Sequence, residues 1–227
     1  MRSESNPPPA GTYAGLPPDL PEEYVRIYEA ARPLLQTRLN DFHTRVATQL
    51  VVELLQRDGG DPRVGIPAII LHDVGWSAIP EQLQRTAFGP GSTNAELNRQ
   101  HEVAGVRLAR GILESVGYPR DLTREILRII DRHDSQPRSM TLEESIVKDA
   151  DKMYRVTKVG FVGALEQLVT LTPQELHDFV ALRAAVWFQS PSALAMARRE
   201  LEARRLEYGL EPAPDVPPPA DYGTGDG

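Results

Sequence analysis

Cysteine is absent from the 227 residues of this chain. Its absence excludes disulfide bonds, thiolate metal sites and cysteine nucleophiles. The chain also has no run of about 18 apolar residues, so we expect no membrane-spanning helix. Its first residues contain no apolar stretch that could act as a secretory signal. We therefore expect a soluble, cytoplasmic protein, and the lack of cysteine agrees with a reducing compartment.

Basic residues are the minority among the charged ones, with 25 Lys and Arg against 32 Asp and Glu and a net charge of −7. This balance argues against a protein that binds duplex nucleic acid through its phosphates. Residues 1–21 carry −1 and residues 211–227 carry −4, which leaves −2 for the body of the chain. A small anionic molecule therefore stays open as a partner.

Proline gathers at both ends of the chain, where residues 1–21 and 211–227 hold eleven of the 20 prolines. We expect these two tails to be disordered. The length between them suits one hydrophobic core, so we predict a single domain over residues 22–210.

Apolar periodicity and helix-end signals predict an all-α domain with no convincing strand. Thr93, Thr141 and Thr172 each stand three residues before a glutamate, which is the pattern of a capping box. Gly117 and Gly209 predict helix ends. We expect helices near residues 22–37, 40–58, 63–72, 94–116, 120–133, 142–170, 173–189 and 192–208.

His72 and Asp73 end the most apolar segment of the chain, residues 66–71. That segment contains Pro67, which favours a short buried helix over a strand. Two ionisable side chains at the edge of a core lose solvation, and a bound cation can compensate an imidazole and a carboxylate together. The alternative is an ordinary helix end, at which His72 contacts free carbonyl groups and Asp73 caps the next turn.

The other histidines extend this feature. His43 precedes His72 by 29 residues and His101 follows it by 29, and His133 closes the next predicted helix. Short loops between antiparallel helices could bring these side chains to one end of a bundle, which is how metal sites form in helical bundles. His177 lies outside the pattern, and we interpret it as an ordinary histidine.

A histidine, a His-Asp doublet followed by glycine, and a late aspartate in an "ADK" context resemble the pattern of the HD superfamily, whose members are all-helical metal-dependent phosphohydrolases and their relatives. The match covers about residues 40–170, and residues 173–208 form further helices of the predicted domain. The resemblance implies that one metal ion is bound by His43, His72, Asp73 and Asp151. It also assigns catalysis to His72 and Asp73.

A second ion is implied in those relatives that bind two, with His101 and His133 as its ligands and Asp73 as a bridge. The alternative is that His101 lies on a polar helix face and His133 caps a helix. Ligands of this kind suit a divalent Mn, Fe, Mg, Co, Ni or Zn ion, so we expect one or two such ions.

The choice between Asp149 and Asp151 does not follow from periodicity. Both flank the apolar stripe of the helix expected over residues 142–170, each about 100° from its centre. The family pattern selects Asp151 and leaves Asp149 as a supporting group for the site or as a surface partner of Lys152.

Phosphate contacts are predicted at Lys152, Arg155 and Arg45, three basic residues close to the ligands in sequence. The partner would be a small phosphorylated molecule, and a homo-oligomer stays open. Trp76 follows the doublet, and core packing is preferred for it over stacking on a base. The loop after it, residues 77–94, is an irregular connection or a mobile lid.

Three functions fit these residues. The first is a phosphohydrolase that acts on a small, nucleotide-like phosphate ester through a metal-activated water. The second is a di-iron oxygenase of the same fold, which would need His101 and His133 for its second metal. The third is a non-catalytic regulatory module that the metal stabilises.

Overall fold

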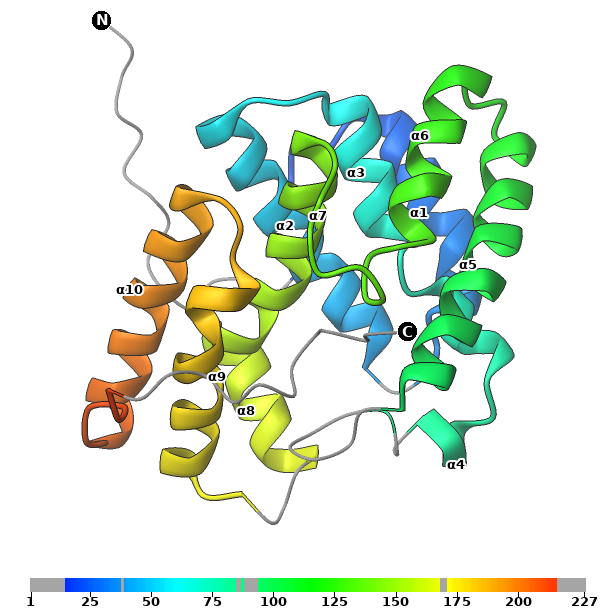
Figure 1. Cartoon of the computed structure of the whole chain (residues 1–227). Coiled ribbons are helices and arrows are strands. Elements are labelled where there is room, and N and C mark those ends of the chain that lie inside the picture. Colours follow the sequence, from blue (N-terminus) through cyan, green and yellow to red (C-terminus); the bar gives the residue numbers. More distant parts are fainter. Residues whose placement is uncertain (1–14, 38, 85–86, 88–93, 168–170, 216–227) are drawn as a thin grey trace, which may run out of the picture.

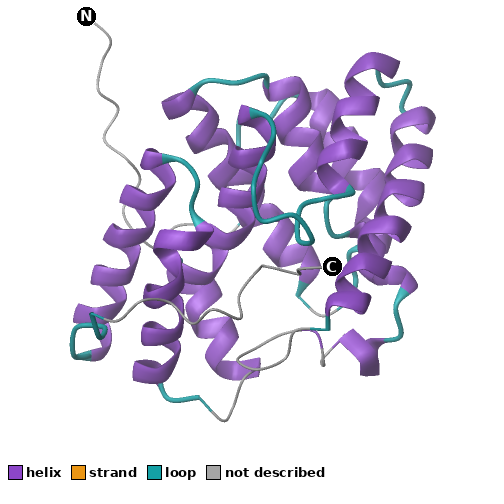
Figure 2. Ribbon diagram, viewed as in Figure 1, coloured by secondary structure: helices purple, strands orange, loops and turns teal. Residues whose placement is uncertain are grey.

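The computed structural model describes residues 15–37, 39–84, 87, 94–167 and 171–215. All regular structure within these ranges is helical, and no strand occurs among them (Figure 2). The prediction of an all-α fold is therefore confirmed. The predicted tails lie mostly outside the described residues, and the division into tails and one domain stays a prediction. In the described part, no helix is long and apolar enough to cross a membrane.

Ten α-helices form the described structure (Figure 1). The first six are α1 (Glu22–Ala31), α2 (Asn40–Asp58), α3 (Pro62–Leu71), α4 (Glu81–Gln84), α5 (Ala95–Ser115) and α6 (Arg120–Ile130). The last four are α7 (Leu142–Met153), α8 (Lys158–Gln167), α9 (Pro173–Trp187) and α10 (Pro191–Tyr208). Short 3-10 helices follow α1, α3 and α7 at η1 (Arg32–Leu34), η2 (Val74–Ala78) and η4 (Tyr154–Val156).

The apolar helix α3 lies at the centre of the bundle, packed against α1, α2, α6 and α7. Every residue from Val64 to Leu71 is buried. Pro67 has no backbone N–H, which leaves the carbonyl of Arg63 without its helical donor. The hydroxyl of Tyr118 donates to that carbonyl at 2.7 Å. The central helix therefore accommodates its proline and delivers the His-Asp doublet to the interior.

The prediction of a single helix over residues 142–170 is wrong. Helix α7 ends at Met153, and α8 begins at Lys158. Thr157 is extended, and its hydroxyl accepts from the backbone N–H of Gly160 at 3.2 Å. A Cβ at Gly160 would lie 1.9 Å from the carbonyl oxygen of Tyr154, so this tight turn requires glycine. The expected apolar stripe is consequently divided between α7 and α8.

Some of the predicted helix-end signals are confirmed and others differ from the structure. Thr172 and Glu175 form the complete capping box, and Gly117 and Gly209 take the left-handed conformation after their helices. Thr141 accepts from the backbone N–H of Glu144, as predicted, but the Glu144 carboxylate reaches back to Met140 instead. The N-cap of α5 is Asn94, whose side chain accepts from the backbone N–H of Leu97. Thr93 lies outside the described residues.

Candidate metal centre

The six predicted ligand residues come together in the interior of the bundle from five different helices or their ends. His43 lies on α2, His101 on α5 and Asp151 on α7, and His72 and Asp73 follow α3 directly. His133 lies in the turn that follows α6. All six are buried, with at most 9% of any residue exposed.

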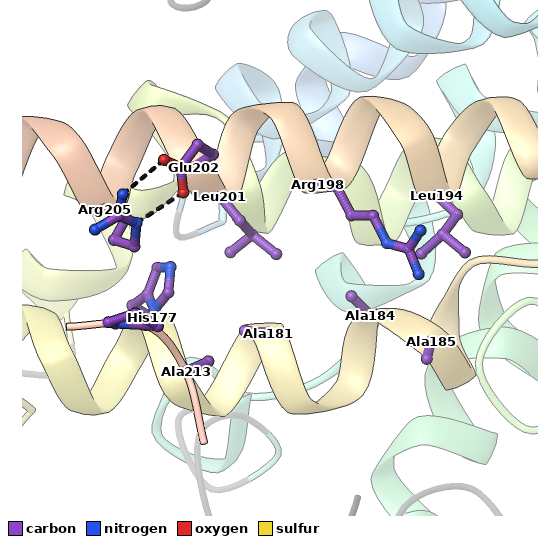
Figure 3. Close-up of a pocket in the computed structure, with 11 residues that line it drawn as sticks. His177, Ala181, Ala184, Ala185, Leu194, Arg198, Leu201, Glu202, Arg205 and Ala213 are labelled. Atoms are coloured by element: carbon purple, nitrogen blue, oxygen red, sulfur yellow. Dashed lines mark hydrogen bonds and ion pairs between the residues drawn. The ribbon is translucent and has the colours of Figure 1, made fainter. Parts of the chain in front are cut away.

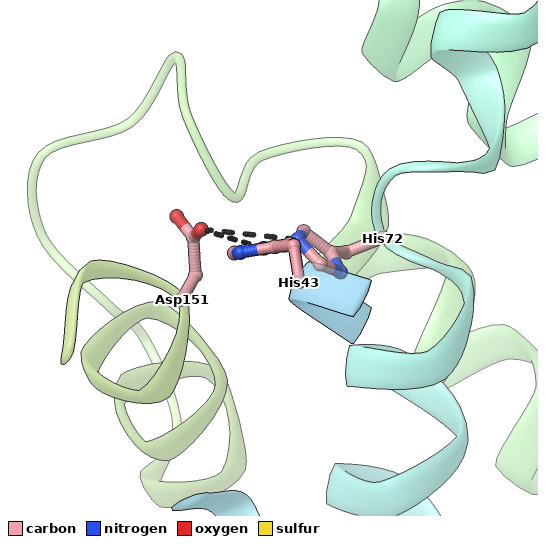
Figure 4. A group of neighbouring side chains, drawn as sticks. All are labelled: His43, His72 and Asp151. Atoms are coloured by element: carbon pink, nitrogen blue, oxygen red, sulfur yellow. Dashed lines mark hydrogen bonds and ion pairs between the residues drawn. The ribbon is translucent and has the colours of Figure 1, made fainter. Parts of the chain in front are cut away.

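The first half-site consists of His43, His72 and Asp151 together with Oδ2 of Asp73. The Nε2 atoms of His43 and His72 are 3.1 Å apart, and Oδ1 of Asp151 lies 3.3 and 3.8 Å from them. Oδ2 of Asp73 lies 3.4 Å from His72 Nε2 and 3.8 Å from His43 Nε2. Figure 4 shows the side chains of His43, His72 and Asp151 pointing toward one another.

The second half-site consists of His101, His133 and Asp134 together with Oδ1 of Asp73. Its two Nε2 atoms are also 3.1 Å apart. Oδ1 of Asp73 lies 3.9 Å from His101 Nε2 and 3.7 Å from His133 Nε2. Oδ2 of Asp134 is 3.7 Å from both histidines. The two oxygens of the Asp73 carboxylate thus face different pairs of histidines.

These donor sets fit divalent metal ions. With metal–ligand bonds of about 2.1 Å, neighbouring ligand atoms lie about 3.0 to 3.4 Å apart, close to the 3.1 to 3.9 Å found here. Nδ1 of His72 donates to the Ile69 carbonyl at 2.7 Å, and Nδ1 of His133 donates to the Ile130 carbonyl at 2.8 Å. These bonds direct the Nε2 atoms toward the carboxylates, as expected of metal-ligating histidines.

The family comparison agrees with this geometry. A model of the HD domain matches residues 41–155, half of the chain. The chain belongs to the HD domain family. Five of the six predicted ligands lie on separate helices or turns within the matched segment, and the sixth, Asp73, adjoins His72.

A solved structure of an HD protein has a similar fold. It is described as a predicted HD superfamily hydrolase from an uncultured Thermotogales bacterium. The TM-score is 0.56 and the sequence identity is 18%, with 82% of this chain and 88% of the other covered. At this identity the likeness shows the fold alone. No curated protein matches the chain.

Charge and burial act in opposite directions in this HD centre. Burial lowers the pKa of His72 to about 4. Burial also acts to lower the pKa of His133, but the carboxylates of Asp134 and Asp73 outweigh it and raise that pKa to about 9. Despite burial, neighbouring histidines hold the pKa of the Asp73 carboxyl well below its usual range, and Lys152 and Arg155 do the same for Asp151.

Two residues after the doublet fix its position against α5. A Cβ at Gly75 would lie 1.9 Å from the His101 carbonyl oxygen, so η2 can approach α5 this closely only with glycine there. The Trp76 ring stacks on the His101 ring at 4.1 Å, and its Nε1 donates to Oδ1 of Asp73 at 3.1 Å. Trp76 is buried, as predicted. Its contacts with the predicted ligands His101 and Asp73 were not predicted.

Asp149 contacts none of the predicted ligands and does not pair with Lys152. Its carboxylate accepts from the backbone N–H groups of Gln189 and Ser190 at 2.8 and 2.9 Å, which ties α7 to the junction between α9 and α10. Burial raises its pKa to about 6. Lys152 pairs instead with Asp134 at 2.8 Å and with Asp151 at 2.7 Å. The proposed surface pair of Asp149 and Lys152 is therefore wrong.

The three predicted phosphate contacts lie at different depths. Lys152 is held between two carboxylates, with 18% of its side chain exposed. Arg155 lies 3.6 Å from Oδ1 of Asp151 and 5.7 Å from the Trp187 ring, with 33% of its side chain exposed. Arg45 pairs with Asp41 at 3.1 Å. Substrate binding by these residues stays a prediction.

Two residues of the centre were missed from the sequence. Asp134 joins the second half-site, and the buried Glu102 accepts from the backbone N–H groups of Asp134 and Ser135. A signal for Asp134 was present, since residues 133–134 form a second His-Asp doublet. The doublet alone is ambiguous, because a third one, at residues 177–178, lies on α9 away from the centre.

His177 lines a cavity of about 480 Å³ between α9 and α10 (Figure 3). Alanines of α9 and leucines of α10 form its apolar walls, and Arg198 and the Glu202–Arg205 pair lie along α10. No residue of either half-site lines this cavity. Residues 85–86 and 88–93 belong to the loop that we interpret as an irregular connection or a mobile lid, and they lie outside the described residues.

Proposed function

We propose that this HD protein is a metal-dependent hydrolase that acts on a small, nucleotide-like phosphate ester. The observation that carries the proposal is the placement of Asp73, whose two carboxylate oxygens face two separate pairs of histidines. A single carboxylate between two sets of ligand atoms is the arrangement expected for a centre that holds two divalent ions.

The residues that would hold the ions are the six predicted ligands: His43, His72, Asp73, His101, His133 and Asp151. A divalent ion bound there supplies acidity to water near neutral pH and polarises a phosphoryl oxygen. The donor set contains imidazole nitrogen and carboxylate oxygen and no sulfur, which suits Mn, Fe, Co, Ni, Zn or Mg. His72 and His133 donate their Nδ1 protons to carbonyl groups, so their Nε2 atoms stay directed at the centre.

Basic residues supply the second requirement of phosphate chemistry, which is charge neutralisation. Arg155 is the best placed of the three predicted contacts because it lies beside Asp151 and keeps a third of its side chain exposed. Arg45 is slightly less accessible, with 29% of its side chain exposed beside Asp41. Lys152 would act on the carboxylates more than on the substrate, since its Nζ already contacts two of them.

The test is hydrolysis by the full chain after metal removal and reconstitution with each candidate ion. The panel consists of nucleoside phosphates and of aryl phosphate mono- and diesters. We expect at least one ion to restore phosphate release. Asp73→Asn should abolish it, and Asp178→Asn, in the doublet of α9, should keep it. If no ion binds and no substrate is cleaved, the proposal is wrong.

A di-iron oxygenase is the second candidate, favoured by the composition of the half-sites. Each contains two histidines and one further carboxylate besides Asp73, and such a set with open positions is typical of non-haem iron oxygenases. Iron analysis with Mössbauer or EPR spectroscopy distinguishes the two. Two coupled irons that react with oxygen would favour the oxygenase, and a redox-inert pair would favour the hydrolase.

A further inference from the structure

The turn after α6 repeats the local structure found after α3. Both doublet histidines donate Nδ1 to a carbonyl three residues earlier, His72 to Ile69 at 2.7 Å and His133 to Ile130 at 2.8 Å. Both direct Nε2 at a second histidine 3.1 Å away. The equivalence raises the question of what the aspartate of the second doublet, Asp134, does.

We propose that Asp134 is a ligand of the second metal ion, so that the two half-sites have the same donor set. Its Oδ2 atom lies 3.7 Å from the Nε2 atoms of both His101 and His133. In the first half-site the corresponding distances from Asp151 are 3.3 and 3.8 Å. This inference rests on the metal-binding part of the proposed function and assigns a ligand outside the histidine pattern.

Lys152 contacts the Asp134 carboxylate through the oxygen that faces away from the histidines. The Nζ atom contacts Oδ1 of Asp134 at 2.8 Å and Oδ2 of Asp151 at 2.7 Å. In each carboxylate it is the other oxygen that faces the histidines. Lys152 therefore occupies the outer oxygens of both half-sites and leaves the inner oxygens for the ions.

The backbone of the turn that carries Asp134 is held in place by Glu102. Glu102, which follows His101 on α5, accepts from the backbone N–H groups of Asp134 and Ser135 at 2.9 and 2.8 Å. Its other oxygen accepts from Arg99 at 2.8 Å. Because Glu102 is fully buried, these bonds are shielded from water and keep the turn beside the helix that carries His101.

The added ligand also sets the charge of the centre. Asp73, Asp134 and Asp151 bring three negative charges, against four positive charges from two divalent ions and one from Lys152. The centre therefore stays positive with both ions bound. A positive, largely buried centre suits an anionic substrate such as a phosphate ester.

Manganese binding tests the proposal without relying on turnover. The full-length protein is stripped of metal and titrated with Mn²⁺, the bound equivalents are counted by elemental analysis, and EPR distinguishes a coupled pair from an isolated ion. We expect two equivalents for the wild type and one for Asp134→Asn. Asp131→Asn, in the same turn but paired with Arg99, should keep two. Circular dichroism verifies that each variant is folded.

Lys152→Met tests whether Asp134 is a metal ligand or only an ion-pair partner of Lys152. If Asp134 is a ligand, Lys152→Met keeps two equivalents, because Lys152 contacts only the outer oxygens and its removal takes away no donor atom. Loss of one ion from Lys152→Met as well as from Asp134→Asn would overturn the inference, as would two equivalents in Asp134→Asn. A wild type that binds one ion also contradicts it and leaves the proposed hydrolase standing. A wild type that binds none contradicts both.

Discussion

The two half-sites have the same kinds of donor atoms and the same 3.1 Å separation between their imidazole nitrogens, yet the doublet histidines, His72 and His133, hold their protons very differently. The pKa of His72 falls to about 4 and that of His133 rises to about 9. Both rings are buried, so burial does not explain the difference. The cause is that His133 has two carboxylates, Asp134 and Asp73, strong enough to outweigh burial, whereas the carboxylates near His72 are not.

The half-sites also differ in what supports them. Asp151 lies on the regular helix α7, whereas Asp134 lies in a turn that Glu102 holds in place. The His101 ring stacks on Trp76, and among the described residues its Nδ1 has no hydrogen-bond partner. The second half-site therefore depends more on particular side chains than on the helices themselves, and we expect it to be the more easily disrupted.

Asp73→Asn should have the largest effect, because Asp73 is the one residue shared by both half-sites. An amide offers one oxygen where the carboxylate offers two, so both ions should bind more weakly. We expect activity to fall by well over the roughly 100-fold seen when a group that merely supports a ligand is removed. Metal analysis and phosphate release measure both effects. Retention of both ions by this variant would show that Asp73 does not join the two half-sites.

Gly75→Ala should destabilise the fold and the second half-site together. The new Cβ would lie 1.9 Å from the His101 carbonyl oxygen and push η2 away from α5. We expect a loss of about 3 kcal/mol in the free energy of unfolding, measured by urea denaturation. Gly111→Ala on α5 is the control, since a Cβ there meets nothing within 4 Å, and it should stabilise by up to about 1 kcal/mol.

Asp149→Ala should weaken the first half-site more than the second, because it loosens α7, which carries Asp151. It leaves the backbone N–H groups of Gln189 and Ser190 without their acceptor, and the Ser190 N–H is buried. We expect the free energy of unfolding to fall by about 2 kcal/mol, as measured by thermal or urea denaturation. The exposed Glu125→Ala on α6 should change it by less than about 0.5 kcal/mol. Equal values for the two variants would contradict the role given to Asp149.

Trp76→Phe should have the smallest effect, and one confined to the second half-site. It removes the N–H donated to Oδ1 of Asp73 but keeps an aromatic ring beside His101. We expect the affinity for the second ion to fall about 10-fold and that for the first to change little, as resolved by a Mn²⁺ titration. Trp187→Phe, outside both half-sites, is the control. An equal loss of affinity for both ions would show that Trp76 does not act on the second half-site alone.

The helices follow from the sequence for physical reasons, whereas the six predicted ligands follow from the resemblance to the HD family. Helical periodicity and end signals are local, and Thr172 with Glu175 forms its capping box within one turn. Asp134 was missed although its doublet is visible, because nothing local separates residues 133–134 from residues 177–178. Only the packing of α6 against α3 and α5 brings the former to the centre.

The sequence by itself determined that this protein is all-helical, has no sulfur ligands and carries a histidine and His-Asp pattern similar to that of the HD family. Tertiary structure alone decided the rest. In the folded chain the two Asp73 oxygens face different histidine pairs, Asp149 accepts from the junction between α9 and α10, and Trp76 stacks on His101. These contacts join residues far apart in the chain, and their distances depend on how the helices pack, which periodicity along one helix does not specify.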